Sequence, residues 1–131
     1  MAHTAVEILP ATPPPVVVHM TTVPFSLAYL SGHLTSQRAA GYDVHVISAP
    51  GEDFDRFTAL TSVTGHPTAI AKAIHPAADS VSLVRIARVL TRLQPSIVHT
   101  HTPKASLLGM AAATMCGVAV RVYHCHGRSE E

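Results

Sequence analysis

Ile97-Val98-His99-Thr100-His101-Thr102-Pro103-Lys104 is the stretch that decides the fold. Its β-branched beginning predicts a buried strand over 96–99, and Thr102 and Pro103 are typical of the cap and the first position of a helix. We expect that helix to run over 104–116 and to end at Gly117. Because a helix follows the strand at once, the next strand cannot pair with it as a hairpin, and the stretch predicts a parallel sheet.

The same alternation of strands and helices extends over most of the chain. We expect strands over 16–18, 44–48, 68–74, 96–99 and 118–123; helices over 25–40, over 104–116 and from Asp79 or Ser80 up to Pro95; and one or two helical turns over 53–60, before Gly65. Crossovers of this kind are right-handed and place helices on both faces of the sheet. The predicted fold class is therefore α/β, a doubly wound and mainly parallel sheet of the Rossmann type.

Length and composition limit the organisation of the chain and its function classes. The 131 residues suffice for one domain, which we assign to 16–131, after a proline-rich tail over 1–15. The net charge of +1, without any basic run, argues against nucleic-acid binding. The apolar stretch over 105–120 is shorter than the roughly 20 residues of a spanning helix. Cys116 and Cys125 lack a partner spacing and indicate thiols in a reducing, cytoplasmic compartment.

Ligands of such sheets bind at the carboxyl ends of the strands, where three polar segments are expected, at 21–26, 100–104 and 124–127. In the first, the hydroxyls of Thr21, Thr22 and Ser26 lie before a helix, where backbone N–H groups can hold an anion. Plain helix capping explains them equally well. The segment lacks the Gly-x-Gly-x-x-Gly pattern, so nothing supports a classical dinucleotide site.

The second segment brings the imidazole of His101, the hydroxyl of Thr102 and the ammonium of Lys104 to one helix start. A cation in the first turn opposes the helix dipole, which favours an anionic ligand such as a phosphate. The alternative is an exposed lysine, which costs little at this position.

In the third segment, alternation points His124 and His126 to the same side, and Gly127 lets the backbone leave the strand. Together with His99 and His101 they would form four imidazoles, and zinc binding is the alternative to a ligand contact by one of them. Metal sites usually have shorter or mixed Cys/His spacing, so we predict no metal.

The arginine face of Arg85, Arg88 and Arg92 predicts a solvated helix surface, with contact to anionic lipid or to a partner as the alternative.

At these segments the sequence resembles a known family. The stretches 18–27, 41–45 with 50–52, 97–105 and 117–127 are similar to the N-terminal half of family-four glycosyltransferases, closest to the branch that assembles bacterial capsule, lipopolysaccharide and exopolysaccharide chains. The segment His99-Thr100-His101-Thr102-Pro103-Lys104 and the closing His126-Gly127 are its most specific parts. Many relatives have a Gly-Gly pair in the first loop, which this sequence lacks.

The resemblance implies a GT-B enzyme with two Rossmann-like domains, the acceptor held mainly by the first and the nucleotide-sugar donor by the second. Transfer would retain the anomeric configuration without a metal or another cofactor, onto a glycan or a lipid-linked acceptor at the inner membrane face. On this chain, His126 would be the catalytic residue that reaches the donor sugar. The substrate-binding residues would be Thr21, Thr22, Ser26, His101, Thr102, Lys104 and Gly127.

The donor-binding half would lie outside this sequence, so we expect the chain alone to be inactive. Apolar patches left without a partner domain would favour peripheral membrane contact or association between copies. Two alternatives stay open: half of a nucleotide-sugar epimerase, and a stand-alone binding module that acts with a separate donor-binding partner.

Overall fold

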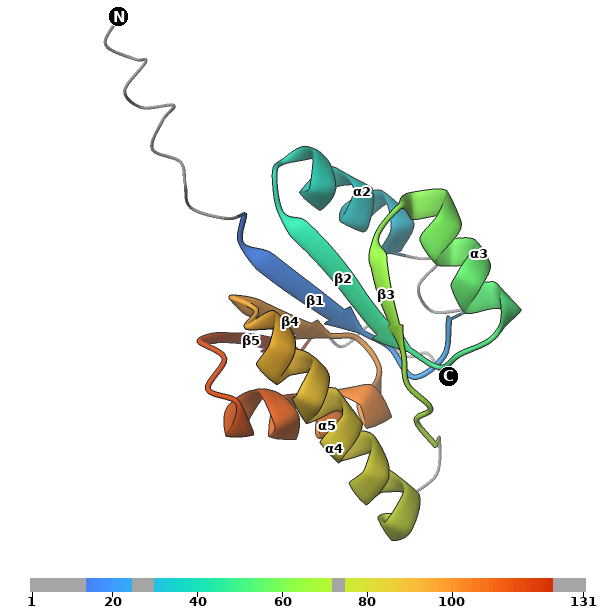
Figure 1. The fold of residues 1–131 in the computed structure, drawn as a ribbon, viewed down its shortest axis with the longest axis vertical. Coiled ribbons are helices and arrows are strands. Elements are labelled where there is room, and N and C mark those ends of the chain that lie inside the picture. Colours follow the sequence, from blue (N-terminus) through green and yellow to red (C-terminus); the bar gives the residue numbers. More distant parts are fainter. Residues whose placement is uncertain (1–13, 25–29, 72–74, 124–131) are drawn as a thin grey trace, which may run out of the picture.

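The computed structural model describes residues 14–24, 30–71 and 75–123. Figure 1 shows a twisted sheet with helices on both sides, and all four strand pairings are parallel. In chain order the elements are β1 (Val16–Met20), α2 (Ser31–Ala39), β2 (Asp43–Ser48), α3 (Glu52–Thr61), β3 (Thr64–Pro67), α4 (Pro76–Leu93), β4 (Ile97–Thr100), α5 (Pro103–Met115) and β5 (Val120–Tyr123). The predicted doubly wound α/β class is confirmed.

The strand order is β3-β2-β1-β4-β5, so the chain reverses its direction of travel across the sheet at β1. β2 and β3 extend the sheet on one side of β1, and β4 and β5 extend it on the other. A crevice at the carboxyl ends of the strands opens at such a reversal, because the two neighbouring connections leave toward opposite faces. The loops after β1 and β4 are therefore the segments that the topology brings together.

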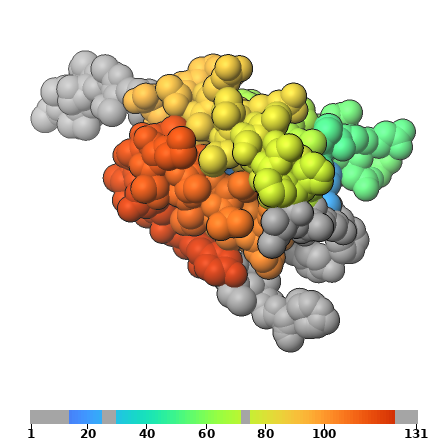
Figure 2. Space-filling model, turned by 90° about the horizontal axis from the view of Figure 1, so that it is seen from below, coloured from blue at the N-terminus to red at the C-terminus, as the bar shows by residue number. Residues whose placement is uncertain are grey.

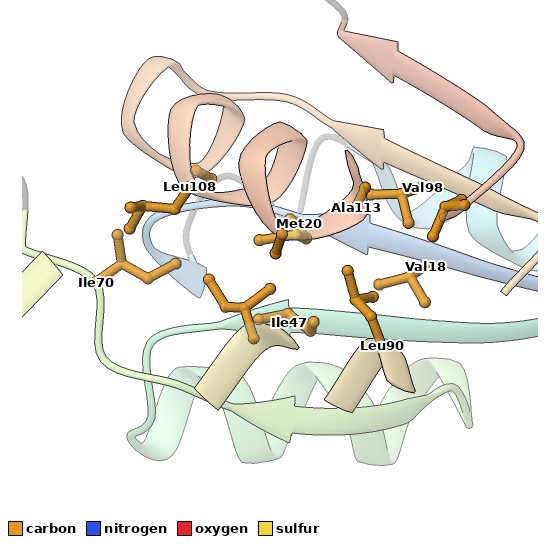
Figure 3. Packing of buried hydrophobic residues seen from close by; sticks show 12 residues of the cluster. Val18, Met20, Ile47, Ile70, Leu90, Val98, Leu108 and Ala113 are labelled. Atoms are coloured by element: carbon orange, nitrogen blue, oxygen red, sulfur yellow. The ribbon is translucent and has the colours of Figure 1, made fainter. Parts of the chain in front are cut away.

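Side-chain alternation along β1 divides the core into two layers. Val18 and Met20 face α4 and α5, where they meet Ile47, Val98 and Leu90, as Figure 3 shows. The opposite face carries a second cluster, which links α2 and α3 to β2 through Leu34, Val44, Val46, Phe54 and Phe57. On the surface, α4 (yellow) and α5 (orange) pack side by side in Figure 2.

The predicted third strand over 68–74 is wrong: β3 lies four residues earlier, at Thr64–Pro67. The sequence pattern predicted one or two helical turns over 53–60, before Gly65, and the next strand only after this glycine. In the structure Ser62 ends α3 with a left-handed φ of 60°, and Gly65 lies within the strand. A Cβ on Gly65 would come within 2.6 Å of the Phe54 ring, so this glycine lets α3 pack against the strand.

The predicted start of α4 at Asp79 or Ser80 is also wrong, because the helix begins at Pro76. His75 occupies the cap position, and its Nδ1 accepts the N–H of Ala78 at 3.1 Å. The N–H of His75 in turn donates to Oδ2 of Asp79 at 3.1 Å. Asp79 therefore caps from inside the first turn, in the reciprocal manner of a capping box.

Among residues 14–24, 30–71 and 75–123, none of the helices has the length and the apolar character that a membrane span requires.

Candidate functional site

The loops after β1 and β4 are joined by side-chain and backbone hydrogen bonds at the carboxyl edge of the sheet. The N–H of Thr22 donates to Oγ1 of Thr102 at 3.0 Å, and the two hydroxyl oxygens lie 2.8 Å apart. The N–H of His101 donates to the carbonyl of Met20 at 3.0 Å, which extends the β1–β4 ladder past the strand ends. Thr102 is the cap residue of α5 as predicted, but its hydroxyl bonds to Thr22 and caps no N–H of the helix.

Thr21 holds the same loop to β2. Its backbone N–H donates to the carbonyl of Ile47 at 3.0 Å. Its buried hydroxyl donates to the carbonyl of Val23 at 2.9 Å and lies 2.9 Å from the hydroxyl of Ser48, which must therefore be the donor of that pair. The hydroxyl of Thr21 is thus engaged within the protein, and Thr22 is buried next to the partly exposed Thr102.

Three imidazoles gather on the side of the sheet that α2 covers, and we call His19, His99 and His101 the histidine cluster. His19 and His99 are register partners on β1 and β4, and His101 follows two residues later with the same side-chain alternation. Nδ1 of His19 lies 2.9 Å from Nε2 of His101. The rings of His99 and His101 stack with centroids 4.1 Å apart, and His19 lies 5.2 Å from each of them.

Helix α2 fixes the orientation of the His19 ring. Nε2 of His19 lies 2.7 Å from Oε1 of Gln37, and an amide oxygen can only accept, so Nε2 carries the proton. Nδ1 of His19 therefore presents its lone pair to the N–H at Nε2 of His101. The ring of His33, one turn before Gln37, approaches His19 edge-on at 5.8 Å.

Burial keeps His19 uncharged at neutral pH. His19 is fully buried, and this burial lowers its pKa to about 4, against the opposing effect of its hydrogen bond to Gln37. The neighbouring His99 and His33 lower the pKa further, because a second positive charge would be unfavourable so close. A neutral imidazole can donate one hydrogen bond and use one lone pair, which suits ligand recognition as well as metal binding.

Lys104 lies buried beneath the start of α5. Its Nζ lies 2.9 Å from Oδ1 of Asp79 and donates to the carbonyl of Ala71 at 2.8 Å. The hydrogen bond from Lys104 lowers the pKa of Asp79, and the N–H of His75 lowers it further. A cation in the first turn of a helix indicates an anionic partner, and within the described residues Asp79 supplies one. A substrate contact of Lys104 stays a prediction.

The structure thus brings Thr21, Thr22, His101 and Thr102 together at one edge of the sheet. Ser26, His124, His126 and Gly127 lie outside the described residues, although β5 ends beside Thr100 at this same edge. Sequence reasoning missed His19 and its contact to Gln37. A signal existed: His19 and His99 each directly follow two β-branched residues, Val17-Val18 and Ile97-Val98, so neighbouring parallel strands would place them side by side.

Comparison with known proteins identifies the family of this fold. The family model of Glycosyltransferase Family 4 matches residues 26–130. The capsular polysaccharide biosynthesis glycosyltransferase CapM of Staphylococcus aureus is 27% identical over 111 residues, which are 85% of this chain and 28% of CapM. The chain therefore spans less than a third of the length of this relative.

Solved structures share the fold at low sequence identity. MurG of Acinetobacter baumannii superposes with a TM-score of 0.72 at 15% identity, over 86% of this chain and 35% of MurG. A UDP-N-acetylglucosamine 2-epimerase superposes with a TM-score of 0.64, also at 15% identity, over 83% of this chain and 33% of the epimerase. These likenesses show a Rossmann-like fold shared with GT-B proteins, and the family match goes further: the chain belongs to glycosyltransferase family 4.

Proposed function

We propose that the chain is the acceptor-side domain of a nucleotide-sugar-dependent, retaining glycosyltransferase that builds bacterial polysaccharide. It belongs to glycosyltransferase family 4, and its relative CapM is named for capsular polysaccharide biosynthesis. The observation that carries the proposal is the junction of the loops after β1 and β4, where Thr22 bonds to Thr102. This junction lies at the reversal of strand order, where sheets of this class bind ligands.

The junction can recognise polar substrates through hydrogen bonds. Thr102 is partly exposed and carries a hydroxyl that pairs with that of the buried Thr22. The start of α5 adds the positive end of a helix dipole, which favours a phosphate or diphosphate. His101, the residue before Thr102, is a buried imidazole. We assign contacts with the acceptor or the diphosphate to Thr21, Thr22, Ser26, His101, Thr102, Lys104 and Gly127, and the contact with the transferring sugar to His126.

Within this proposal the chain needs a donor-binding domain for turnover. Its partners are then a nucleotide-sugar and a glycan or lipid-linked acceptor, at the inner face of the membrane. On its own the chain can orient the acceptor. The diphosphate of the nucleotide-sugar then lacks the contacts that the donor-binding domain would supply. Since transfer requires both substrates in reacting geometry, we expect no turnover by the chain alone.

The experiment compares the chain alone with the chain joined to the donor-binding half of a family relative. Both are incubated with a panel of nucleotide-sugars and an isoprenyl-diphosphate-linked sugar acceptor, and the products are analysed by mass spectrometry and by NMR of the anomeric centre. We expect a retained glycosidic product from the completed enzyme only. Transfer above a buffer blank by the chain alone, or an inverted product, would contradict the proposal.

Two variants sharpen this test. His126→Ala in the completed enzyme should reduce kcat strongly, because it removes the group assigned to the sugar. His66→Gln removes an imidazole that lies outside the assigned residues and serves as the matched control, with activity near that of the unmodified enzyme. Epimerised nucleotide-sugar formed without any acceptor would identify the epimerase alternative instead. Transfer restored by a separately expressed donor-binding chain would identify the binding module.

A further inference from the structure

The histidine cluster has the composition of a transition-metal site. One ring nitrogen from each of His19, His99 and His101 can be chosen so that the three atoms lie within 4.8 Å of one another. We propose that these three imidazoles bind one divalent transition-metal ion of the zinc class at the carboxyl ends of β1 and β4. This inference departs from the metal-free expectation of the sequence analysis, and it does not rest on the proposed function.

The geometry needs only a small adjustment of the rings. Zinc–nitrogen bonds of about 2.0–2.1 Å at tetrahedral angles place neighbouring ligand atoms about 3.3 Å apart. Nδ1 of His19 and Nε2 of His101 are already 2.9 Å apart. The widest separation of the three nitrogens, at most 4.8 Å, must shrink by up to about 1.5 Å, which ring rotation at side-chain torsions can provide.

The surroundings prepare His19 as a ligand. Its Nε2–H donates to Oε1 of Gln37, which leaves the lone pair of Nδ1 directed at Nε2 of His101. Metal-bound histidines almost always donate their other N–H to such an outer acceptor, which fixes the tautomer and the ring orientation. For His101 to bind through Nε2, its proton moves to Nδ1, a tautomer exchange that leaves the imidazole neutral and releases no proton overall.

The ligand set also indicates which ions fit. Three imidazole ligands favour zinc, copper, nickel or cobalt over magnesium and calcium, which prefer oxygen ligands. Three protein ligands leave the fourth position of a tetrahedral ion for water or a bound oxygen. Two separate segments supply the three ligands. His19 comes from β1, His99 comes from β4, and His101 directly follows β4.

Another histidine pair supplies a matched control within the same sheet. Nδ1 of His45 lies 2.9 Å from Nε2 of His66, the same separation as that of His19 and His101, and the rings stack with centroids 5.1 Å apart. This pair has only two imidazoles, with Asp43 at 3.1 Å from the other nitrogen of His45. Because the pair lacks a third imidazole, we expect it to bind zinc more weakly than the histidine cluster does. Its variants therefore test whether binding needs the cluster or only two histidines in contact.

The test measures binding of zinc and of cobalt(II) to the purified chain by isothermal titration calorimetry and by visible absorption. We expect one zinc per chain that survives dialysis, and a cobalt spectrum of a four-coordinate site without thiolate charge-transfer bands. His99→Gln and His101→Gln should each weaken binding roughly 100-fold or more, and Gln37→Leu about 10–100-fold, the range of outer-shell changes. His66→Gln and the double variant His124→Gln/His126→Gln should bind as the unmodified chain does.

NMR of the unmodified chain keeps the test independent of whether a variant folds. Zinc at one equivalent should shift the ring signals of His19, His99 and His101 and leave those of His45 and His66 in place. The proposal is wrong if no stoichiometric zinc binds, if the shifts fall on other histidines, or if folded His99→Gln and His101→Gln retain the original affinity. Loss of binding only in the His124/His126 double variant would equally overturn it.

Discussion

The hydroxyl oxygen of Thr22 lies 2.8 Å from the hydroxyl oxygen of Thr102, although 80 residues separate them in the sequence. The two residues belong to the loops after β1 and β4, and the bond joins these loops where the strand order reverses. Each residue reaches the other because the two strands are parallel neighbours, so both loops leave the sheet at one edge. The candidate site is therefore a product of strand pairing and not of a continuous motif.

The Thr22–Thr102 junction predicts unequal effects of two similar substitutions. Thr102→Val removes the acceptor of the Thr22 N–H as well as the bond between hydroxyls, whereas Thr22→Val removes only the second. At about 1 kcal/mol for each hydrogen bond, we expect Thr102→Val to lower the free energy of unfolding by about 2 kcal/mol and Thr22→Val by about half of that. Urea unfolding measures both. Thr102→Ser is the control, and equal losses in the two valine variants would contradict the prediction.

From the Lys104–Asp79 ion pair we predict that removing the carboxylate of Asp79 destabilises the fold more than removing the ammonium of Lys104. Asp79→Asn leaves the buried ammonium of Lys104 with the carbonyl of Ala71, whereas Lys104→Met leaves a more exposed carboxylate that keeps the N–H of His75. An uncompensated buried charge is the costlier defect. We therefore expect a lower thermal midpoint for Asp79→Asn than for Lys104→Met. The reverse order would show that the ammonium reaches water.

The same pair predicts a loss of stability in acid. The folded pKa of Asp79 is lowered, chiefly by Lys104, so the unfolded chain takes up the proton first. The stabilisation is complete above the ordinary carboxyl pKa of about 4 and disappears as the pH falls through the lower folded value. Between pH 5 and pH 2 the free energy of unfolding should therefore fall less steeply with decreasing pH for Asp79→Asn than for the unmodified chain. Urea unfolding at a series of pH values measures this dependence.

At Gly109 we predict that alanine lowers the stability of the fold, although helix propensity alone would favour alanine. A Cβ at this position in α5 would lie 2.7 Å from Sδ of Met20 and 2.8 Å from Cγ2 of Thr100, both fully buried. Alanine in a helix normally gains up to about 1 kcal/mol over glycine. Here overpacking should dominate and cost about 1–3 kcal/mol in chemical denaturation. Gly32→Ala, in α2 with open space around it, is the control and should be neutral or stabilising.

His66 predicts a second dependence on pH, in the range where histidine titrates. Its burial, followed by the effects of His45 and Arg92, lowers the pKa of the folded form. Below about pH 6.5 the unfolded chain therefore binds this proton more readily, and stability falls as the pH drops from 7 to 5. His66→Gln should reduce this slope in thermal unfolding measured across that range. Parallel profiles for the two proteins would count against a folded pKa below the ordinary value.

Local patterns in the sequence were sufficient for most of the elements. The run from Ile97 to Lys104 predicted β4, the cap at Thr102 and the start of α5, because β-branched residues, a hydroxyl cap and a proline at the first helical position each act over a few residues. The third strand and the start of α4 were misplaced for the opposite reason. Gly65 and His75 take their roles from contacts, with the ring of Phe54 and with Asp79 respectively, that a local pattern does not contain.

The sequence by itself determined the fold class and the edge of the sheet at which polar loops gather, because periodicity and turn residues are properties of neighbouring positions. Only the tertiary structure decided which polar side chains meet. His19 and His101 are 82 residues apart and come into contact through the pairing of β1 with β4, and Lys104 turns to Asp79 because α4 packs beside α5. Such partners depend on strand order and helix packing, which arise from burial over the whole chain and leave no short-range mark in the sequence.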